Sequence, residues 1–464
     1  MDPNPVAALA SAVPADMLQV GADIPERHLH DWMEAAAPGT ALALARPRST
    51  EEVGALLRVC HRLRLPVVPQ GGLTGLAGGA VPVPGCVLLS LERMCGVEEI
   101  DAAACTATVL AGTPLETVQQ AAWEAGLFFP LDLGARGSCT IGGNLSTNAG
   151  GNRVLRYGMA RDLVLGLEAV LADGSVVGNL NKMLKNNTGY DLKQLFVGSE
   201  GTLGVITRAV LRLHPQPRST CTALCAVAGY DGVLELLRHV RSGLGSTLSA
   251  FEMMWPDFYG LVTRRVAGLA APLPHGHGAY VLVESMGSDP AHDQAHFEQV
   301  LGEALEAGVV ADAVIAQSGD ETRALWRVRD ASGELRRVFW PHTGFDVSIA
   351  AGQIGAFVED CCDRLRRRWP GLETVFFGHV GDANIHIGVR IGEGEQPVAQ
   401  IEELVYGCVG DWRGSISAEH GIGTLKRAHL HLSRSKNELA IMGLLKRALD
   451  PQGILNPGKV FAGT

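Results

Sequence analysis

The sequence predicts an α+β protein of two or three domains. The chain has 464 residues, of which 47% are hydrophobic and 19% charged, so it can bury a large core. Three glycine-rich segments, at 69–80, 133–151 and 196–207, are separated by short strands and helices. Loops of this composition let a backbone press against a ligand, and we therefore expect an α+β domain wrapped around one long ligand.

The first elements follow from local patterns. Residues 1–38 form an irregular or helical lead-in, and residues 40–45 form a short apolar strand. Ser49 and Glu52 have capping-box spacing ahead of apolar residues at helical intervals, which predicts a helix. A second strand is expected at 65–69.

The glycine-rich segment 69–80 follows that strand, and another strand is expected at 87–90. A Rossmann fold would open a helix directly at the glycines, so the segment is not that dinucleotide fingerprint. Its backbone N–H groups can still form a concave site for a pyrophosphate. A flexible surface loop is the alternative.

Later elements show the same kinds of pattern. Residues 162–172 are expected to form a strand, with Asp173-Gly174 as its hairpin turn and Val176-Val177 as the return. Further along, residues 234–238 are expected to be helical and residues 279–284 to form a strand.

Two histidines flank a predicted turn in the second half of the chain. Residues 381–384 form this turn between two short apolar strands. The pairing then begins with Val380 and Ile385. It places His379 opposite His386, with Cβ atoms about 4.5–5.5 Å apart, so one metal ion could bind both imidazoles.

A Glu–His pair supplies the other parts of a metal site. Glu419 and His420 precede glycines at 421 and 423, which can bend the chain enough for both side chains to reach one site. Two imidazoles and a carboxylate leave a position open on a bound metal, and a further histidine can act as a base beside it. For any one histidine alone, a packed or solvated side chain is the alternative.

Charge and hydropathy exclude several classes of protein. The formal net charge of −10 argues against non-specific nucleic-acid binding. No transmembrane run and no N-terminal signal pattern is found, so we expect a cytoplasmic protein. The ten cysteines lack zinc-ribbon or iron–sulfur spacing and are expected to be reduced.

The motifs together resemble the FAD-linked oxidase family of the vanillyl-alcohol-oxidase flavoprotein fold. The resemblance rests on the three glycine-rich loops, the histidine and Glu–His motifs and the closing segment 455–460, and it covers the chain from about residue 39. Within the family, the D-lactate, glycolate and D-2-hydroxyglutarate dehydrogenases are the most similar group. A two-subdomain FAD-binding domain plus an α+β substrate or cap domain is implied.

The resemblance also implies domain borders. Residues 1–38 are a lead-in, 39–217 the FAD-binding domain, 218–418 the substrate or cap domain with the metal site, and 419–464 a segment that returns to the FAD-binding domain.

The same resemblance implies FAD contacts in each loop. The first loop holds the pyrophosphate, the second lies along the flavin and its ribityl chain, and the third lines the adenosine and isoalloxazine side. The expected residues are Gly71, Gly72, Thr74, Gly75, Gly134, Ser138, Gly142, Gly143, Asn144, Gly151, Glu200, Gly204, Val205, Ile206 and Asn456. Because the first loop has no histidine, non-covalent FAD is expected.

For the chemistry, the resemblance assigns a divalent metal to His379, His386 and Glu419. Zinc is favoured, although manganese, cobalt or iron would also suit these ligands. His420 removes the proton of a metal-bound 2-hydroxyl, and hydride passes to flavin N5. Arg329 binds the substrate carboxylate with its planar fork, and an exposed helix arginine is the alternative.

One departure from the family concerns the substrate. In the D-2-hydroxyglutarate branch, threonine, lysine and asparagine occupy the positions of Gly333, Gly344 and Gly388. Three glycines cannot anchor a second carboxylate, so D-lactate or a longer monocarboxylate is favoured over D-2-hydroxyglutarate. His342 is a candidate for compensating charge.

Other functions stay open at this point. The same architecture hosts oxidases, reductases and ether-lipid synthases, although the Glu–His motif disfavours a reductase. A flavin subunit of a glycolate-oxidase-type complex is a second alternative, and a zinc hydrolase is a third. The expected partners are a small 2-hydroxy acid and an unidentified electron acceptor, and the sequence is compatible with a homodimer or a complex subunit.

Overall fold

The computed structural model describes residues 4–32 and 40–461, which form two compact units. The first unit contains the described residues of 1–151, 158–216 and 419–464. The second contains residues 152–157 and 217–418. The chain therefore leaves the first unit twice and returns to it twice.

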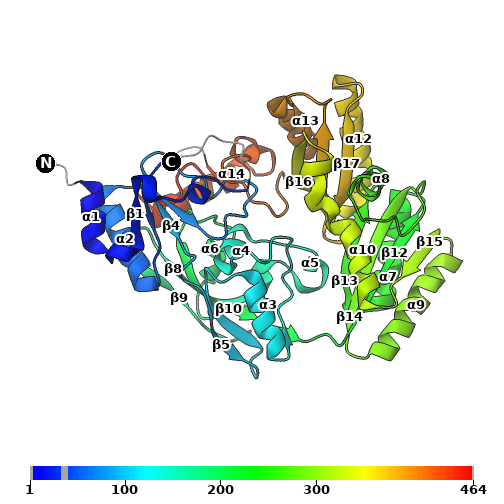
Figure 1. The fold of residues 1–464 in the computed structure, drawn as a ribbon, viewed down its shortest axis with the longest axis horizontal. Helices are drawn as coiled ribbons and strands as arrows, with labels where there is room; N and C mark the ends of the chain where they lie inside the picture. Colours follow the sequence, from blue (N-terminus) through cyan, green and yellow to red (C-terminus); the bar gives the residue numbers. More distant parts are fainter. Residues whose placement is uncertain (1–3, 33–39, 462–464) are drawn as a thin grey trace. The chain divides into compact units, whose positions relative to one another are not determined.

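The first unit contains a four-stranded sheet and a five-stranded sheet (Figure 1). The four-stranded sheet consists, in spatial order, of β1 (Leu18–Val20), β2 (Ala41–Ala45), β4 (Cys86–Ser90) and β3 (Val67–Gln70). The five-stranded sheet consists of β5 (Val97–Asp101), β6 (Thr106–Leu110), β10 (Val205–Arg212), β8 (Val164–Val170) and β9 (Val176–Asn179). A short pair is formed by β7 (Leu127–Phe128) and β11 (His214–Pro215).

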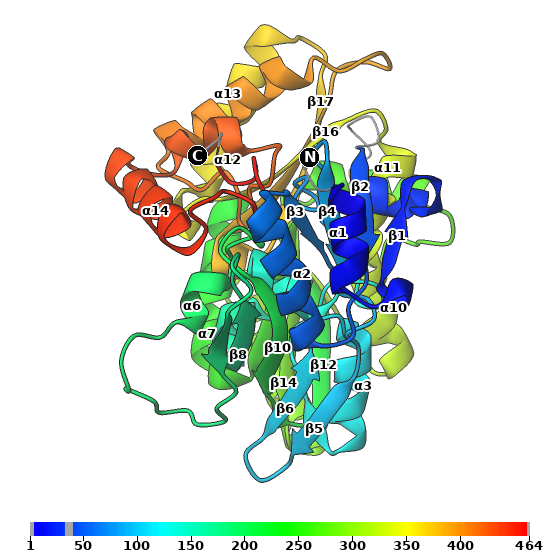
Figure 2. The same cartoon turned by 90° about the vertical axis from the view of Figure 1, so that its left-hand side faces the viewer.

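Six helices of the first unit accompany these sheets in the described residues (Figure 2). They are α1 (Pro5–Ala12), α2 (Thr50–Leu63), α3 (Leu115–Glu124), α4 (Ile141–Thr147), α6 (Lys193–Phe196) and α14 (Lys436–Leu449). The predicted helix is α2, and Ser49 is its N-cap residue. The Ser49 hydroxyl accepts a bond from the N–H of Glu52. The Glu52 carboxylate binds the N–H of Arg48 at 2.6 Å instead of that of Ser49, so only half of the predicted capping box forms.

The predicted strands of the first unit are confirmed. β2, β3 and β4 lie where apolar runs were expected, and β8 pairs with β9 around a turn in which Gly174 has a φ of +81°. That left-handed backbone explains the glycine.

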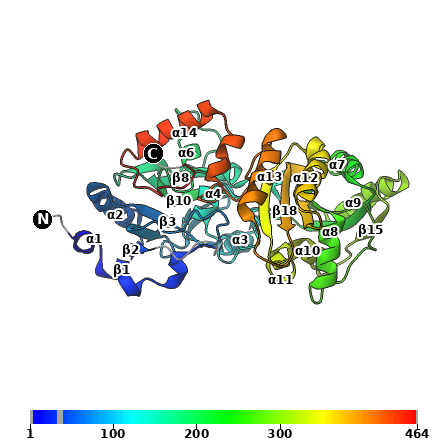
Figure 3. The same ribbon diagram turned by 90° about the horizontal axis from the view of Figure 1, so that it is seen from above.

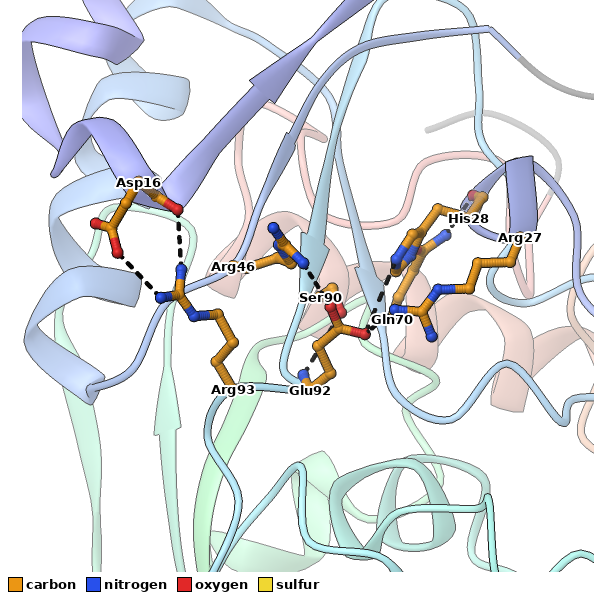
Figure 4. A network of polar contacts seen from close by, with 8 residues as sticks. All are labelled: Asp16, Arg27, His28, Arg46, Gln70, Ser90, Glu92 and Arg93. Atoms are coloured by element: carbon orange, nitrogen blue, oxygen red, sulfur yellow. Dashed lines mark hydrogen bonds and ion pairs between the residues drawn. The ribbon is translucent and has the colours of Figure 1, made fainter. Parts of the chain in front are cut away.

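The lead-in is part of the first unit. Figure 4 shows the contacts that its residues make with the four-stranded sheet. The buried His28 binds Gln70 Oε1 through Nδ1 at 2.8 Å, and burial lowers the pKa of His28, which favours the neutral imidazole. Gln70 Nε2 donates to the carbonyls of His28 and Ala80, both at 2.9 Å. Gln70 thus links the two ends of the first glycine-rich loop.

The second unit is built on a seven-stranded antiparallel sheet. Its strands, in spatial order, are β15 (Asp312–Ile315), β12 (Ser219–Val227), β14 (Ala279–Gly287), β13 (Leu248–Met254), β17 (Glu373–Gly378), β18 (Asn384–Arg390) and β16 (Thr343–Ser348). The strand expected near 279–284 is β14, and the helix expected near 234–238 lies in α7 (Tyr230–Leu244).

Helices cover both faces of this sheet (Figure 3). On one face lie α7, α9 (Pro290–Glu306), α12 (Ile354–Arg368) and α13 (Val398–Asp411). On the other lie α8 (Pro256–Arg265), α10 (Gly319–Asp330) and α11 (Leu335–Val338), which share a buried apolar cluster with the sheet. A polar side chain buried between these helices and the sheet therefore needs a hydrogen-bond partner.

A short segment that follows the second glycine-rich loop belongs to the second unit. Arg153, just before α5 (Val154–Tyr157), pairs with the buried Glu284 at 3.3 Å. Arg156 donates to the carbonyl of Met286 at 2.5 Å. No local pattern in the sequence indicates this crossing.

No helix in the described ranges has the length and apolar composition needed to span a bilayer. The ten cysteines are free thiols, and most of them are buried.

The first two glycine-rich loops of the first unit touch through their backbones. A Cβ atom on Gly72 would lie 1.9 Å from the carbonyl oxygen of Ser138, and one on Gly71 would lie 2.5 Å from Thr140 Oγ1. Any larger residue at 72 therefore requires movement of the backbone.

Gly72→Ala is expected to lower the free energy of unfolding by about 3 kcal/mol or more, because overpacking against a rigid carbonyl cannot relax through a side chain. Urea denaturation measures this change. The matched control is Gly407→Ala in α13, where a Cβ meets nothing within 4 Å. There alanine should be neutral or stabilise the protein by up to about 1 kcal/mol. Equal stability of the two variants would contradict the tight contact.

Candidate active site

The predicted register of the histidine hairpin is wrong. His386 in β18 lies opposite Phe377, not opposite His379, and the N–H of Asn384 donates to the carbonyl of His379 at 3.2 Å. The four-residue connection is displaced by one position, to 380–383, and Ala383 lies in the left-handed region with φ +73°.

The two histidines nevertheless lie together. The register differs from the predicted one by two residues, and an even shift keeps each side chain on its face of the sheet. His379 is thus a diagonal neighbour of His386, and their ring centroids are 5.5 Å apart.

A buried charged cluster surrounds His379 in the second unit. Glu252 in β13 receives a bond from Arg329 Nε at 2.7 Å on one carboxylate oxygen, and its other oxygen lies 2.7 Å from His379 Nδ1. Arg329 Nη2 lies 3.2 Å from His379 Nε2. Glu252, Arg329 and His379 are 1%, 4% and 5% exposed. Because they are buried this deeply, each uses the other two as hydrogen-bond partners in place of water.

These contacts determine the tautomer of His379. A guanidinium can only donate, so Nε2 of His379 must be the acceptor toward Arg329. The proton is then on Nδ1 and is donated to Glu252. Burial alone would raise the pKa of Glu252, but the charge of Arg329 and the hydrogen bonds from Arg329 and His379 hold it below its usual value, which keeps the carboxylate ionised.

Arg329 is not an exposed helix arginine. It lies near the end of α10 on the covered face of the sheet, with its guanidinium 5.1 Å from the centroid of the Phe377 ring. The stacked arrangement leaves a planar, positively charged group beside His379.

Asp346 is a site residue that the sequence analysis missed. It is fully buried in β16, directly opposite His386 in the sheet, with 3.8 Å between Asp346 Oδ1 and His386 Nδ1. Its carboxylate also accepts bonds from Asn384 Nδ2 at 2.8 Å and from the N–H of Ala418 at 3.0 Å. The sequence contained one indication of a special role for Asp346, because this acid lies between Phe345 and Val347 in an apolar strand.

The chain continues from Ala418 into the predicted Glu–His motif. Glu419 is joined to Ala418 by a peptide bond, so it follows directly on the segment that Asp346 holds. Within the first unit, Glu419 Oε2 accepts a bond from the N–H of Gly151 at 3.0 Å. Gly151 was predicted as a cofactor contact, and its φ of +102° suits only glycine.

Glu200 holds the segment that follows His420. Its carboxylate accepts bonds from the N–H groups of Ile422 at 2.7 Å and Gly423 at 2.8 Å. Burial raises the pKa of Glu200, and these two backbone bonds oppose the rise. The structure thus gives Glu200 a role in shaping the loop after His420 in addition to its predicted place beside FAD.

Buried side chains hold the end of the first glycine-rich loop. Asn456 Nδ2 donates to the carbonyls of Gly79 at 3.0 Å and Glu200 at 2.7 Å, and Lys459 Nζ donates to that of Val81 at 2.7 Å. Burial lowers the pKa of Lys459 to about 8. Asn456 Oδ1 is a buried acceptor without a hydrogen-bond partner.

These features fit a bound FAD in the first unit. The orphaned Asn456 oxygen is an acceptor for a ligand donor, and the loop contacts at Gly71 and Gly72 admit no side chain. The sequence analysis did not assign Gln70 or Lys459 to the cofactor site. Each is a polar residue next to a glycine, Gly71 or Gly458, and this position was an indication of a role there.

The other predicted cofactor residues differ in their surroundings. Gly142 and Gly204 pack tightly, against Ala111 and the ring of Phe196, while a Cβ on Gly134 would meet nothing within 4 Å. The remaining residues are placed as follows: Thr74 and Gly143 are half-buried, Gly75 and Ser138 are exposed, Asn144 is buried in α4, and Val205 and Ile206 are buried at the start of β10.

Two family models match the chain. An FAD binding domain matches residues 41–178, and the C-terminal domain of FAD linked oxidases matches residues 216–460. The fold and these matches define an FAD-binding flavoprotein. The chain belongs to the FAD-linked oxidase family.

Named relatives are similar over nearly the whole chain. A D-2-hydroxyglutarate dehydrogenase of Xanthomonas citri pv. viticola is 39% identical, and the match covers 99% of this chain and 97% of the relative. A mitochondrial D-2-hydroxyglutarate dehydrogenase of Arabidopsis thaliana is 40% identical, over 93% of this chain and 77% of the relative. A putative mitochondrial D-lactate dehydrogenase of Schizosaccharomyces pombe is also 40% identical, over 92% and 83%.

Solved structures confirm the predicted vanillyl-alcohol-oxidase type of fold. p-Cresol methylhydroxylase with bound substrate gives a TM-score of 0.78 at 17% identity, over 99% of this chain and 96% of that chain. Alkyldihydroxyacetonephosphate synthase gives 0.76 at 17% identity, over 98% and 85%.

Proposed function

We propose that this protein is an FAD- and divalent-metal-dependent dehydrogenase that oxidises a D-2-hydroxy acid to the 2-oxo acid. The names of the relatives support the reaction class. The observation that carries the proposal is the 3.2 Å between Arg329 Nη2 and His379 Nε2. A 2-hydroxy acid has its carboxylate and hydroxyl on adjacent carbons, so it needs a carboxylate binder directly beside a ligand of the metal that holds the hydroxyl.

The roles proposed for individual residues follow from their chemistry. Arg329 binds the substrate carboxylate, and His379, His386 and Glu419 hold the metal. When bound, FAD supplies a hydride acceptor and a divalent metal lowers the pKa of the hydroxyl. His420 removes the hydroxyl proton. The tautomer of His379 puts the lone pair on Nε2, which accepts from Arg329 Nη2 at 3.2 Å. A metal held by this nitrogen would replace that bond, while the bond from Arg329 Nε to Glu252 could remain.

A monocarboxylate such as D-lactate is proposed as the preferred substrate. A Cβ on Gly388 would lie 2.7 Å from Val375 Cγ2 and 3.3 Å from Phe339 Cε1, so hydrocarbon fills the space that a polar side chain would need. Gly344 lies opposite Gly388 in the sheet and adds no side chain. Burial lowers the pKa of His342, so this imidazole is neutral near pH 7 and supplies no fixed charge.

D-2-Hydroxyglutarate is the second candidate substrate, because several relatives bear that name. The identities of 39–40% do not distinguish it from lactate, since a relative named as a D-lactate dehydrogenase is equally similar. The zinc-hydrolase alternative is not retained, because the chain carries the FAD binding domain. Membership of a glycolate-oxidase-type complex, non-covalent attachment of FAD, the electron acceptor and the cytoplasmic location stay predictions.

The substrate prediction is tested on a panel of D-2-hydroxy acids with the purified holoenzyme. Bleaching of the flavin absorbance by each acid gives the rate of reduction without any assumption about the acceptor. D-Lactate and longer aliphatic 2-hydroxy acids should reduce the flavin with a higher second-order rate constant than D-2-hydroxyglutarate. A strong preference for the dicarboxylate would show that the argument from the glycines is wrong.

His420→Ala is expected to retain FAD and metal while slowing flavin reduction by about 10² or more, the usual effect of a lost general base. Stopped-flow reduction with saturating substrate measures the rate. Metal and flavin contents of the same preparation serve as controls. Reduction at the normal rate would reject the assigned role of His420.

A further inference from the structure

The carboxylate of Glu252 joins two groups that have separate tasks in the proposed function. One oxygen binds Arg329, the proposed carboxylate binder, and the other binds His379, a proposed metal ligand. We infer that Glu252 is a positioning residue, which keeps the proton of His379 on Nδ1 so that Nε2 can ligate, and which anchors the guanidinium of Arg329 through Nε. This inference rests on the proposed function.

The position of the proton on His379 decides which nitrogen can ligate a metal. A histidine can ligate a metal through Nε2 only if the proton is on Nδ1, and an acceptor at Nδ1 secures that state. Glu252 is that acceptor, at 2.7 Å and with 1% of its surface exposed. A carboxylate that accepts from a metal-binding imidazole also makes the ligand more basic and typically improves metal affinity 10- to 100-fold.

The charge of Arg329 also bears on metal binding. Arg329 is a permanent cation next to the nitrogen that would receive a second cation. Glu252 is within 2.7 Å of this arginine and compensates its charge inside the unit. Without that carboxylate, Arg329 would repel a metal at His379 and would lose the partner that orients its fork.

Glu252 also connects two elements of the unit. The two carboxylate oxygens of Glu252 accept at the same time from two donors that lie on different elements, Arg329 on α10 and His379 after β17. A glutamine has one acceptor oxygen and one N–H₂ group, so it can satisfy only one of these donors and opposes the other. Glu252→Gln therefore removes the link with little change in volume.

The chain provides a matched control. Glu284 in β14 is also 1% exposed, and its carboxylate binds Arg153, Ser249 Oγ at 2.9 Å and Trp326 Nε1 at 2.9 Å. None of these contacts involves a proposed metal ligand or substrate binder. Glu284→Gln removes an equally buried charge from the same face of the same sheet.

The test measures zinc affinity directly. Holoenzyme is stripped of metal with a chelator, and Zn²⁺ is returned in competition with a chromophoric chelator. Glu252→Gln should raise the Kd for Zn²⁺ by about 10- to 100-fold, whereas Glu284→Gln should change it by less than about twofold. Both variants should retain FAD. Urea denaturation shows whether the two substitutions destabilise the protein similarly, which separates positioning from a loss of stability.

Glu252→Asp is the second variant, in case Glu252→Gln does not fold. It keeps the charge but is one methylene shorter, so it cannot reach both donors, and weaker zinc binding is again expected. The inference is overturned if either folded Glu252 variant binds Zn²⁺ as tightly as the unmodified protein while His379→Ala does not. If His379→Ala also binds Zn²⁺ normally, the proposed metal site itself is wrong, so the two failures are distinguishable.

Discussion

The site in the second unit depends on one constraint, namely that a buried arginine must have a buried counter-charge. Arg329 is 4% exposed, and leaving its guanidinium unpaired at that depth would cost several kcal/mol. Glu252 supplies the counter-charge and uses its second oxygen to set the proton of His379. The stabilising ion pair and the arrangement of the proposed chemical groups are therefore the same set of contacts.

Hydrogen bonds between carboxylates and backbone N–H groups hold the segments around the remaining site residues. Asp346 fixes the N–H of Ala418, and in the first unit Gly151 and Glu200 hold the loop around the Glu–His motif. Buried carboxylates that accept backbone N–H bonds stiffen a loop without occupying its outer face. Such rigidity is what a base requires if it is to meet a small substrate in one geometry.

The sequence indicated the fold, the glycine-rich loops and the two histidines, because turns, apolar runs and glycines are local features. It did not indicate the register of the hairpin, since a shift by two residues leaves the pattern of faces unchanged. The roles of Glu252 and Asp346 were also hidden, because their partners lie 77 and 40 positions away in the chain. The crossing of residues 152–157 involves Glu284, which is 131 positions from Arg153.

Zinc K-edge X-ray absorption of the metal-loaded holoenzyme tests the central claim most directly, because it reports which atoms bind the metal. We expect close to one zinc per chain, with imidazole nitrogens at about 2.0–2.1 Å and an oxygen ligand at about 2.0–2.2 Å. In His379→Ala, the contribution of imidazole ligands to the absorption spectrum should decrease. A protein that binds no stoichiometric metal, or a spectrum without imidazole ligands, would contradict it.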